Sequence, residues 1–374
     1  MGVGRFVFTP VLPLMETGAG LTSDGASYVA TANYVGYLVG ALVGIAAPPL
    51  ARRRLSLRVA GALLLITLAA MPLAHDAAAW VILRGSAGAA SAIVFMVAGN
   101  VIVSEFATRS TQLVGWAYGG VGAGIALSGM LMAVVSSIGD WKTAWWAAAL
   151  LTAVLLAGGW NVGQAGGATA TMPAKTAGAS APQRQKGPWF VLLSASYFLE
   201  GAGYIVTGTF LIAALSATSP GWLSGSAWTI VGLAAIPSCA VWASLATRVS
   251  RPTLITAALF IQAVGIALPA ISSHPAAGVI SAVLFGATFM AITTLSLATG
   301  VHLGITRAIP LLTAGYGIGQ ILGPLLVAPL LADGYQLALL AGGVLVFLAA
   351  VGALLLRIRF PHHDQASLWA RRTA

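Results

Sequence analysis

Charged side chains are scarce in this chain. Of its 374 residues, 18 are Lys or Arg and 8 are Asp or Glu, so charged residues make up 7% and hydrophobic residues 59%. A soluble domain carries about 25% charged residues, which cover its surface. The composition therefore excludes a soluble enzyme, a disordered chain and a nucleic-acid-binding module. It indicates a polytopic α-helical membrane protein, and the length suffices for about twelve spans of about 20 residues.

Motifs of cofactor, metal and redox chemistry are also lacking. Cys239 is the single cysteine, so neither an intrachain disulfide nor a CxxC pair can form. There is no Walker A sequence, and the GVGRFV run at residues 2–7 lacks the third glycine of a dinucleotide-binding fingerprint. We therefore expect no enzymatic activity, no cofactor and no metal site.

Long apolar runs separated by short polar breaks dominate what is present. The runs do not alternate between polar and apolar residues, so they indicate helices rather than the strands of a barrel. Open sheet edges are not tolerated in hydrocarbon either. We predict an all-α membrane protein whose twelve transmembrane helices span residues 2–16, 27–50, 58–74, 78–104, 113–137, 141–160, 188–214, 223–247, 252–271, 276–301, 308–331 and 335–356.

The basic residues predict how these spans are oriented. With both chain ends in the cytoplasm, fifteen basic residues face inward and only Lys142 faces outward. Such a bias is the signature of cytoplasmic loops, so we expect a multi-pass protein of the cytoplasmic (inner) membrane. The inward-facing residues are Arg52, Arg53, Arg54, Arg58, Arg109, Lys175, Arg184, Lys186, Arg248, Arg251, Arg307, Arg357, Arg359, Arg371 and Arg372, and the outward-facing acids are Glu16, Asp24, Asp76, Asp140 and Asp333.

A polar segment divides the spans into two groups of six. Residues 161–187 are rich in Gly, Ala, Ser, Thr and basic residues, which indicates a flexible cytoplasmic linker. We therefore predict pseudo-symmetric six-helix bundles at 1–160 and 188–358, with a tail at 359–374. Short motifs recur at corresponding places in the two bundles: GVGRFV resembles GAGYIV at 201–206, and YGGVG at 118–122 resembles YGIG at 316–319.

Glycine and proline are frequent inside the spans. The glycines of 113–137 and 308–331 favour close helix packing, and a sliding surface between the bundles is the alternative. Pro10 and Pro13 should kink the first span and free backbone carbonyls, which are tolerated at membrane depth where they line a cavity.

Glu200 is the acidic candidate at membrane depth. It lies twelve residues from the start of its span near Pro188, which at 1.5 Å per residue is about 18 Å, close to the bilayer midplane. Desolvation favours the neutral carboxyl, so Glu200 would suit proton coupling. The alternative is a structural partner for a buried arginine.

Arg5 and Arg84 are the two basic candidates at membrane depth. A guanidinium stays charged, and its planar fork of donors suits carboxylate, sulfonate or phosphate groups. We therefore expect Arg5 to bind an anionic substrate, with a permanent salt bridge to Glu200 as the alternative. Arg84 is a weaker candidate, because it lies about six residues from the outer side and a side chain this shallow can also reach outward.

Polar and aromatic residues inside the spans complete the predicted substrate site. Each is individually more often an interhelical hydrogen bond than a ligand contact. The additional candidates for substrate binding are Asn33, Tyr37, Tyr118, Tyr204, Thr207, Tyr316 and Gln320.

These segments together resemble a known family. Six plus six helices around a basic linker resemble the major facilitator superfamily, and GRFVFTPVLPLM at 4–15 resembles the first-helix signature of YbfB/YjiJ-type transporters within it. ANYVGYLVGA at 32–41, GVGAGIALSG at 120–129 and EGAGYIVTGTFL at 200–211 are similar to further family segments. The resemblance implies that helices 1, 4, 7 and 10 line a central cavity and that the two bundles rock in alternating access.

Two places depart from the family pattern. The loop PPLARRRLSLR at 48–58 lacks the acid that this family carries there, so the resemblance implies no charge latch at that loop. The first span from Met1 to Met15 reaches about 22 Å, less than the roughly 30 Å of the hydrocarbon core. We hypothesise that about ten further apolar residues precede Met1, because a core of that thickness takes about 20 apolar residues to span.

The sequence thus predicts a secondary active transporter. It would move a small anionic or amphipathic organic solute by alternating access, coupled to protons through Glu200. Its partners would be that solute and the lipid bilayer, with no nucleic acid, and the chain would act as a monomer. One rival is drug or metabolite efflux through a weakly selective cavity; another is a non-transporting membrane sensor.

Overall fold

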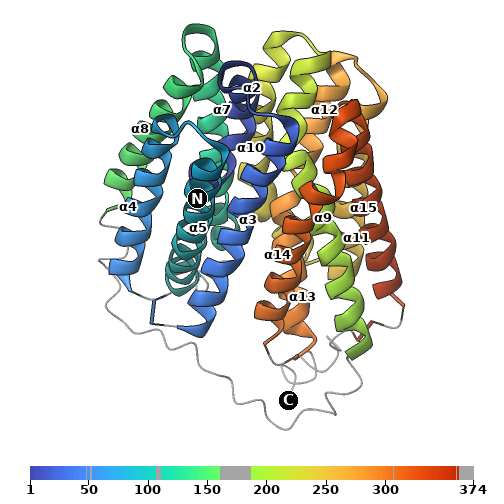
Figure 1. Cartoon of the computed structure of the whole chain (residues 1–374). Helices are drawn as coiled ribbons and strands as arrows, with labels where there is room; N and C mark the ends of the chain where they lie inside the picture. Colours follow the sequence, from blue (N-terminus) through green and yellow to red (C-terminus); the bar gives the residue numbers. More distant parts are fainter. Residues whose placement is uncertain are drawn as a thin grey trace, which may run out of the picture.

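The computed structural model describes residues 1–47, 49–50, 53–106, 111–160, 187–305, 307–358 and 360–361. This part of the chain is helical and contains no strand (Figure 1). Eleven helical segments within it are long and apolar enough to cross a membrane. The helices are α1 (Gly2–Phe6), α2 (Phe8–Ala19), α3 (Ser23–Ala46), α4 (Arg54–Ala70), α5 (Ala77–Phe106), α6 (Thr111–Tyr118), α7 (Gly120–Ile138), α8 (Trp141–Gly159), α9 (Gly187–Thr218), α10 (Gly221–Leu245), α11 (Arg251–Ile271), α12 (Pro275–Gly286), α13 (Phe289–His302), α14 (Ala308–Val327) and α15 (Tyr335–Leu356), with 3₁₀ turns at Met71–Leu73 and Ala328–Asp333.

The predicted runs coincide with these helices to within a few residues. Nearly all of the predicted linker, and the tail from residue 362, lie outside the described residues. Three of the predicted runs are each interrupted once along their length. Helices α1 and α2 meet at Val7, α6 and α7 meet at Gly119, and α12 and α13 meet at residues 287–288.

A specific feature accompanies each break. Pro10 has no N–H to donate to the oxygen of Phe6, the residue at which α1 ends. At Gly119 the backbone lies against α10, where a Cβ would come within 2.4 Å of the oxygen of Ile236. At the third break the oxygen of Ala287 accepts a hydrogen bond from Trp242 Nε1 at 2.9 Å instead of continuing the helical ladder.

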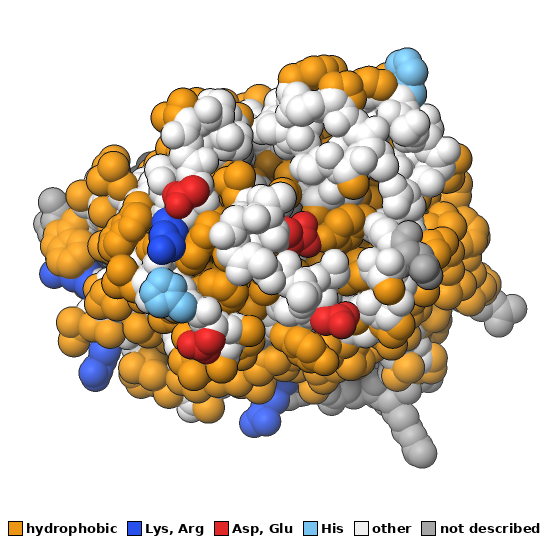
Figure 2. Space-filling model, turned by 45° about the horizontal axis from the view of Figure 1, so that its top comes forward, with side chains coloured by type: hydrophobic (Ala, Val, Ile, Leu, Met, Phe, Trp, Pro, Cys, Tyr) orange, Lys and Arg blue, Asp and Glu red, His pale blue; other side chains and the backbone are white. Residues whose placement is uncertain are grey.

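Charged residues mark the two ends of the molecule. Arg53, Arg54, Arg58, Arg248, Arg251, Arg307 and Arg357 flank helix ends on one side, which we call the basic end. Glu16, Asp24, Asp76 and Asp140 flank helix ends on the other side, the acidic end. Figure 2, which brings the upper side of Figure 1 forward, shows acidic side chains gathered on the acidic end. The predicted separation of charges is therefore present among the described residues.

The chain forms an N-terminal half, α1–α8, and a C-terminal half, α9–α15, which lie side by side (Figure 1). Helix α3 packs on α14, α7 on α10, and α2 on α9 across the interface. The contact of α7 with α10 is backbone on backbone: a Cβ at Gly232 would come within 2.1 Å of Ala126 N, and one at Gly129 within 2.5 Å of Thr229 N. The glycines of this span therefore serve close packing at the surface where the halves meet.

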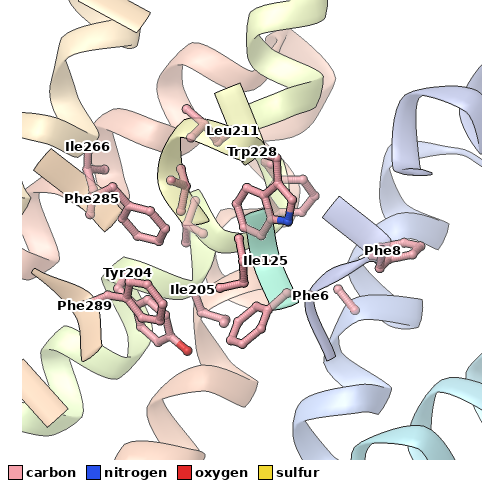
Figure 3. Packing of buried hydrophobic residues seen from close by; sticks show 14 of the residues in the cluster. Phe6, Phe8, Ile125, Tyr204, Ile205, Leu211, Trp228, Ile266, Phe285 and Phe289 are labelled. Atoms are coloured by element: carbon pink, nitrogen blue, oxygen red, sulfur yellow. The ribbon is translucent and has the colours of Figure 1, made fainter. Parts of the chain in front are cut away.

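Aromatic rings fill the space between the halves where two helix breaks face each other. Phe6 at the end of α1 makes an edge contact with Phe289 at the start of α13, with ring centroids 6.2 Å apart, and lies 6.5 Å from Trp228. Tyr204 stacks on Phe289 at 6.1 Å (Figure 3). This group, which we call the aromatic plug, joins the two halves into one core.

Candidate substrate and proton site

Arg5 lies in the interface between the halves. Its side chain is 5% exposed. Nη2 donates to Gln320 Oε1 of α14 at 2.5 Å, and Cζ lies 3.9 Å from the ring centroid of Tyr37 in α3. The rings of Phe6 and Tyr34 lie farther off, at 5.3 and 5.7 Å. The guanidinium is thus held by neutral groups, the amide of Gln320 and the tyrosine Tyr37, and by the aromatic faces around it.

Gln320 connects Arg5 to three stacked tyrosines. Its Nε2 donates to the hydroxyl of Tyr204 in α9 at 2.9 Å. Tyr316 of α14 stacks between Tyr204 and Tyr197, with ring centroids 5.6 and 4.3 Å away. The close packing of α9 against α14 at this point depends on Gly201, because a Cβ there would lie 2.6 Å from the backbone oxygen of Tyr316. Polar groups of α1, α9 and α14 therefore meet at one depth.

Glu200 is fully buried inside the C-terminal half. Its side chain is 0% exposed, and neither carboxyl oxygen makes a hydrogen bond within the described part of the chain. Gln262 of α11 lies beside it, and its amide atoms also lack a hydrogen bond of good geometry to any described residue. The salt bridge between Arg5 and Glu200, the alternative suggested by the sequence, is therefore not present.

Arg84 has a backbone role. It is 1% exposed, so it does not reach outward from the membrane. Its Nη1 donates to the oxygen of Gly4 at 3.0 Å, and its Nη2 to the oxygen of Arg5 at 2.9 Å. These are the carbonyls just before the helix break at Val7, where the regular ladder stops. Asn33 Nδ2 in turn donates to the oxygen of Arg84 at 2.9 Å, joining α3 to α5.

A cavity of about 520 Å³ lies between the halves on the basic side of these groups. Tyr118 and Phe95 line it from the N-terminal half, and Cys239 and Thr293 from the C-terminal half. It reaches Arg251 at the basic end. Most of its lining is apolar, so it can accept the body of an organic molecule.

Hydrogen bonds join the halves on the acidic side. Thr9 in α2 donates to the oxygen of Gly208 in α9. The hydroxyl of Tyr34 donates to Thr209 at 2.8 Å, because Thr209 uses its own hydrogen on the oxygen of Ile205. Nearer the acidic end, Tyr335 of α15 donates to Glu16 of α2. The two halves are thus closed on the acidic side and separated by a cavity on the basic side.

A family model with the description "Uncharacterised MFS-type transporter YbfB" matches residues 1–354. The chain belongs to this family of MFS-type transporters. No curated protein matches the chain. The family resemblance is confirmed, and with it a role in membrane transport.

In this YbfB-type transporter, six of the nine predicted substrate-binding residues lie close to one another or to the cavity. Arg5, Tyr37, Tyr204, Tyr316 and Gln320 form one cluster, and Tyr118 lines the cavity beside it.

Three predicted residues lie apart from this cluster. Arg84 and Asn33 bind backbone oxygens. Thr207 is buried in α9, and its hydroxyl has no hydrogen-bond partner among the described residues.

Two residues that lie beside the predicted site residues of this YbfB-type transporter were not predicted from the sequence. Gln262 is the polar neighbour of Glu200, and Tyr197 stacks on Tyr316. A lone amide in the apolar run 252–271 was a visible signal for Gln262. Tyr197 lies three residues before Glu200, on the same helical face.

Proposed function

We propose that this protein is a secondary active transporter that moves a small amphipathic organic anion by alternating access, coupled to protons. Arg5 binds the anionic group and Glu200 carries the proton. The observation that carries the proposal is that Arg5 and Glu200, two buried ionisable side chains of opposite type, form no ion pair with each other. Such charges are costly in a membrane interior, and a transporter that binds an anion and a proton can offset that cost in each cycle.

The cavity supports the amphipathic character of the solute. It is lined mainly by apolar side chains and lies between halves that are closed on the acidic side. Efflux of lipophilic cations through attraction to Glu200 is the rival. The anion is favoured because Arg5, not Glu200, lies at the interface between the halves, whereas Glu200 faces Gln262 within one half.

The proposal includes the arrangement in the membrane. Twelve spans in two bundles of six would rock about the shared interface, with the paired contacts of α3 with α14 and α7 with α10 as the surfaces that move. The basic end would face the cytoplasm of the cell and the acidic end the outside. The protein would act as a monomer in the inner membrane.

Flux measurements in proteoliposomes test the proton role. Benzoate, a small aromatic anion, serves as the first probe, and a dye inside the vesicles reports proton movement. Glu200→Gln should abolish benzoate uptake driven by a pH gradient but retain exchange of labelled for unlabelled benzoate. The matched control is Asp24→Asn, which changes an exposed acid at the acidic end and should leave both fluxes unchanged. Proton-driven uptake that survives in Glu200→Gln removes Glu200 from the mechanism.

Competition separates the rivals. If the solute is an anion, benzoate analogues should compete with one another and lipophilic cations such as tetraphenylphosphonium should not. Competition by the cation alone would favour efflux. A sensor that transports nothing would show no flux with any compound that stabilises the purified protein in a thermal-shift screen.

A further inference from the structure

The bond between Arg5 and Gln320 joins a charged group to a neutral one. Arg5 can only donate, so the amide of Gln320 must present its oxygen to Arg5 and its nitrogen to Tyr204. The two distances, 2.5 and 2.9 Å, fit this orientation. Gln320 is fully buried, and its amide is used at both ends.

This amide satisfies a hydrogen of Arg5 without neutralising its charge. Arg5 Nε has no hydrogen-bond partner in the described part of the chain, and the carboxyl of Glu200 is bonded to none of the described residues. A carboxylate in the place of the amide oxygen would form a charge-assisted bond, which is roughly twice as strong as a neutral one. A carboxylate oxygen would therefore bind Arg5 more strongly than the amide oxygen of Gln320 that now occupies this position.

The surroundings of Arg5 indicate the chemistry of that occupant. The faces of Tyr37, Phe6 and Tyr34 lie around the guanidinium. A carboxylate with a flat apolar body would meet the guanidinium at one end and aromatic faces along its length.

We propose that Gln320 is an internal ligand of Arg5, which holds the guanidinium while the transporter is empty and which an incoming aromatic or similarly flat carboxylate displaces. The inference rests on the proposed anion transport and adds a specificity-determining residue to it. Because Arg5 belongs to α1 and Gln320 to α14, the displacement also removes a bond between the halves. Substrate binding would thereby loosen the interface that must open.

Replacing Gln320 by an acid tests this without any solute. In Gln320→Glu, a carboxylate occupies the position that we assign to the substrate. At pH 7.5, the melting temperature should rise by several degrees when Arg5 is present, and the rise should vanish or reverse when Arg5→Gln is combined with it. An equal change of melting temperature with and without Arg5 would show that the two positions do not couple and would overturn the proposal.

Benzoate binding provides a second test, in which Gln320→Ala serves if the acidic variant does not fold. Benzoate should bind Gln320→Ala more tightly than the unmodified protein, because it no longer competes with the amide. It should bind Gln320→Glu at least about tenfold more weakly, the factor that corresponds to one charge-assisted bond. Benzamide, which has the same shape without the charge, should bind none of them measurably.

Equal benzoate affinity in all three proteins, including the absence of binding to all three, would overturn the proposal. These measurements use protein in detergent and need no flux. Failure of proton-driven transport with the expected binding order would therefore reject the proposed function and keep the role of Gln320. The reverse result would reject the role of Gln320 alone.

Discussion

Arg84 of α5 donates a hydrogen bond from Nη2 to the backbone oxygen of Arg5 at 2.9 Å. One arginine thus fixes the backbone that carries the other. Together with the hydrogen bond to the oxygen of Gly4, this bond satisfies two backbone carbonyls at the end of α1. These bonds fix the backbone position from which the side chain of Arg5 extends. Arg84, which the sequence suggested as a substrate-binding residue, thus positions Arg5, the other candidate.

Arg84→Met should destabilise the protein by at least about 2 kcal/mol, because two buried carbonyls lose a charged donor. Thermal unfolding in detergent measures this, with Arg248→Met, a change at an exposed arginine of the basic end, as the control that should change little. If Arg84→Met keeps its melting temperature and loses only substrate affinity, Arg84 is a substrate ligand rather than a positioning residue.

Gly232→Ala should disturb the contact between the halves. Its Cβ would lie 2.1 Å from Ala126 N, closer than atoms approach without displacement of the backbone. We expect a loss of about 1–3 kcal/mol in stability, the usual cost of overpacking, together with loss of flux. The control is Gly120→Ala, where nothing lies within 4 Å of the added Cβ. Normal stability and flux in Gly232→Ala would show that the interface is not packed as described.

Tyr335→Phe should loosen the closure at the acidic end, since it removes the bond to Glu16. Under the proposed alternating access, a molecule that opens there would close the cavity on the basic side, which Cys239 lines. The rate at which a thiol reagent modifies Cys239 should therefore fall several-fold. Tyr28→Phe, a change at an exposed tyrosine of α3, is the control. An unchanged rate in Tyr335→Phe would show that this bond does not govern the closure.

Asp140 caps α8 outside the membrane-spanning segment. Hydrogen bonds from the backbone N–H and hydroxyl of Thr143 hold the pKa of Asp140 below its usual range. Since the folded pKa lies below the unfolded value of about 3.9, the stabilisation is present above that pH and is lost as pH falls through the folded value.

The melting temperature of Asp140→Ala should therefore lie below that of the unmodified protein at pH 7, and the difference should shrink at pH values under about 4. Asp140→Asn can cap without titrating, so its melting temperature at pH 7 should lie close to the unmodified value. A difference between Asp140→Ala and the unmodified protein that stays constant with pH would contradict a charged cap.

The helices of this protein could be predicted because hydrophobic runs are long and their polar breaks are short. That Arg5, Arg84 and Glu200 lie inside long hydrophobic runs followed from the sequence. Their partners did not, because depth says nothing about rotation around the helix axis. Arg84 was expected near the outer side, where its side chain could reach outward, yet it binds the backbone oxygens of Gly4 and Arg5. Arg5 binds an amide 315 residues away in sequence.

The positions of the helix breaks could not be predicted from the sequence either. Pro10 signals a disturbance in the first span, but Val7 and Thr288 are not residues that interrupt helices by themselves. The break before α13 depends on Trp242, which reaches the oxygen of Ala287 from another helix. Tertiary contacts of this kind cannot be read from local propensity. The proximity of Gln262 to Glu200 also depends on tertiary packing, so the sequence alone did not indicate it.

The aromatic plug has an electrical consequence. Phe6, Trp228, Tyr204 and Phe289 place packed aromatic rings along the interface between the halves, so water and small ions meet an apolar barrier at these rings. A bilayer that contains this protein in the conformation closed on the acidic side should therefore keep its electrical resistance and hold a voltage. Tight insulation of this kind lets a carrier draw on an ion gradient without dissipating it between turnovers.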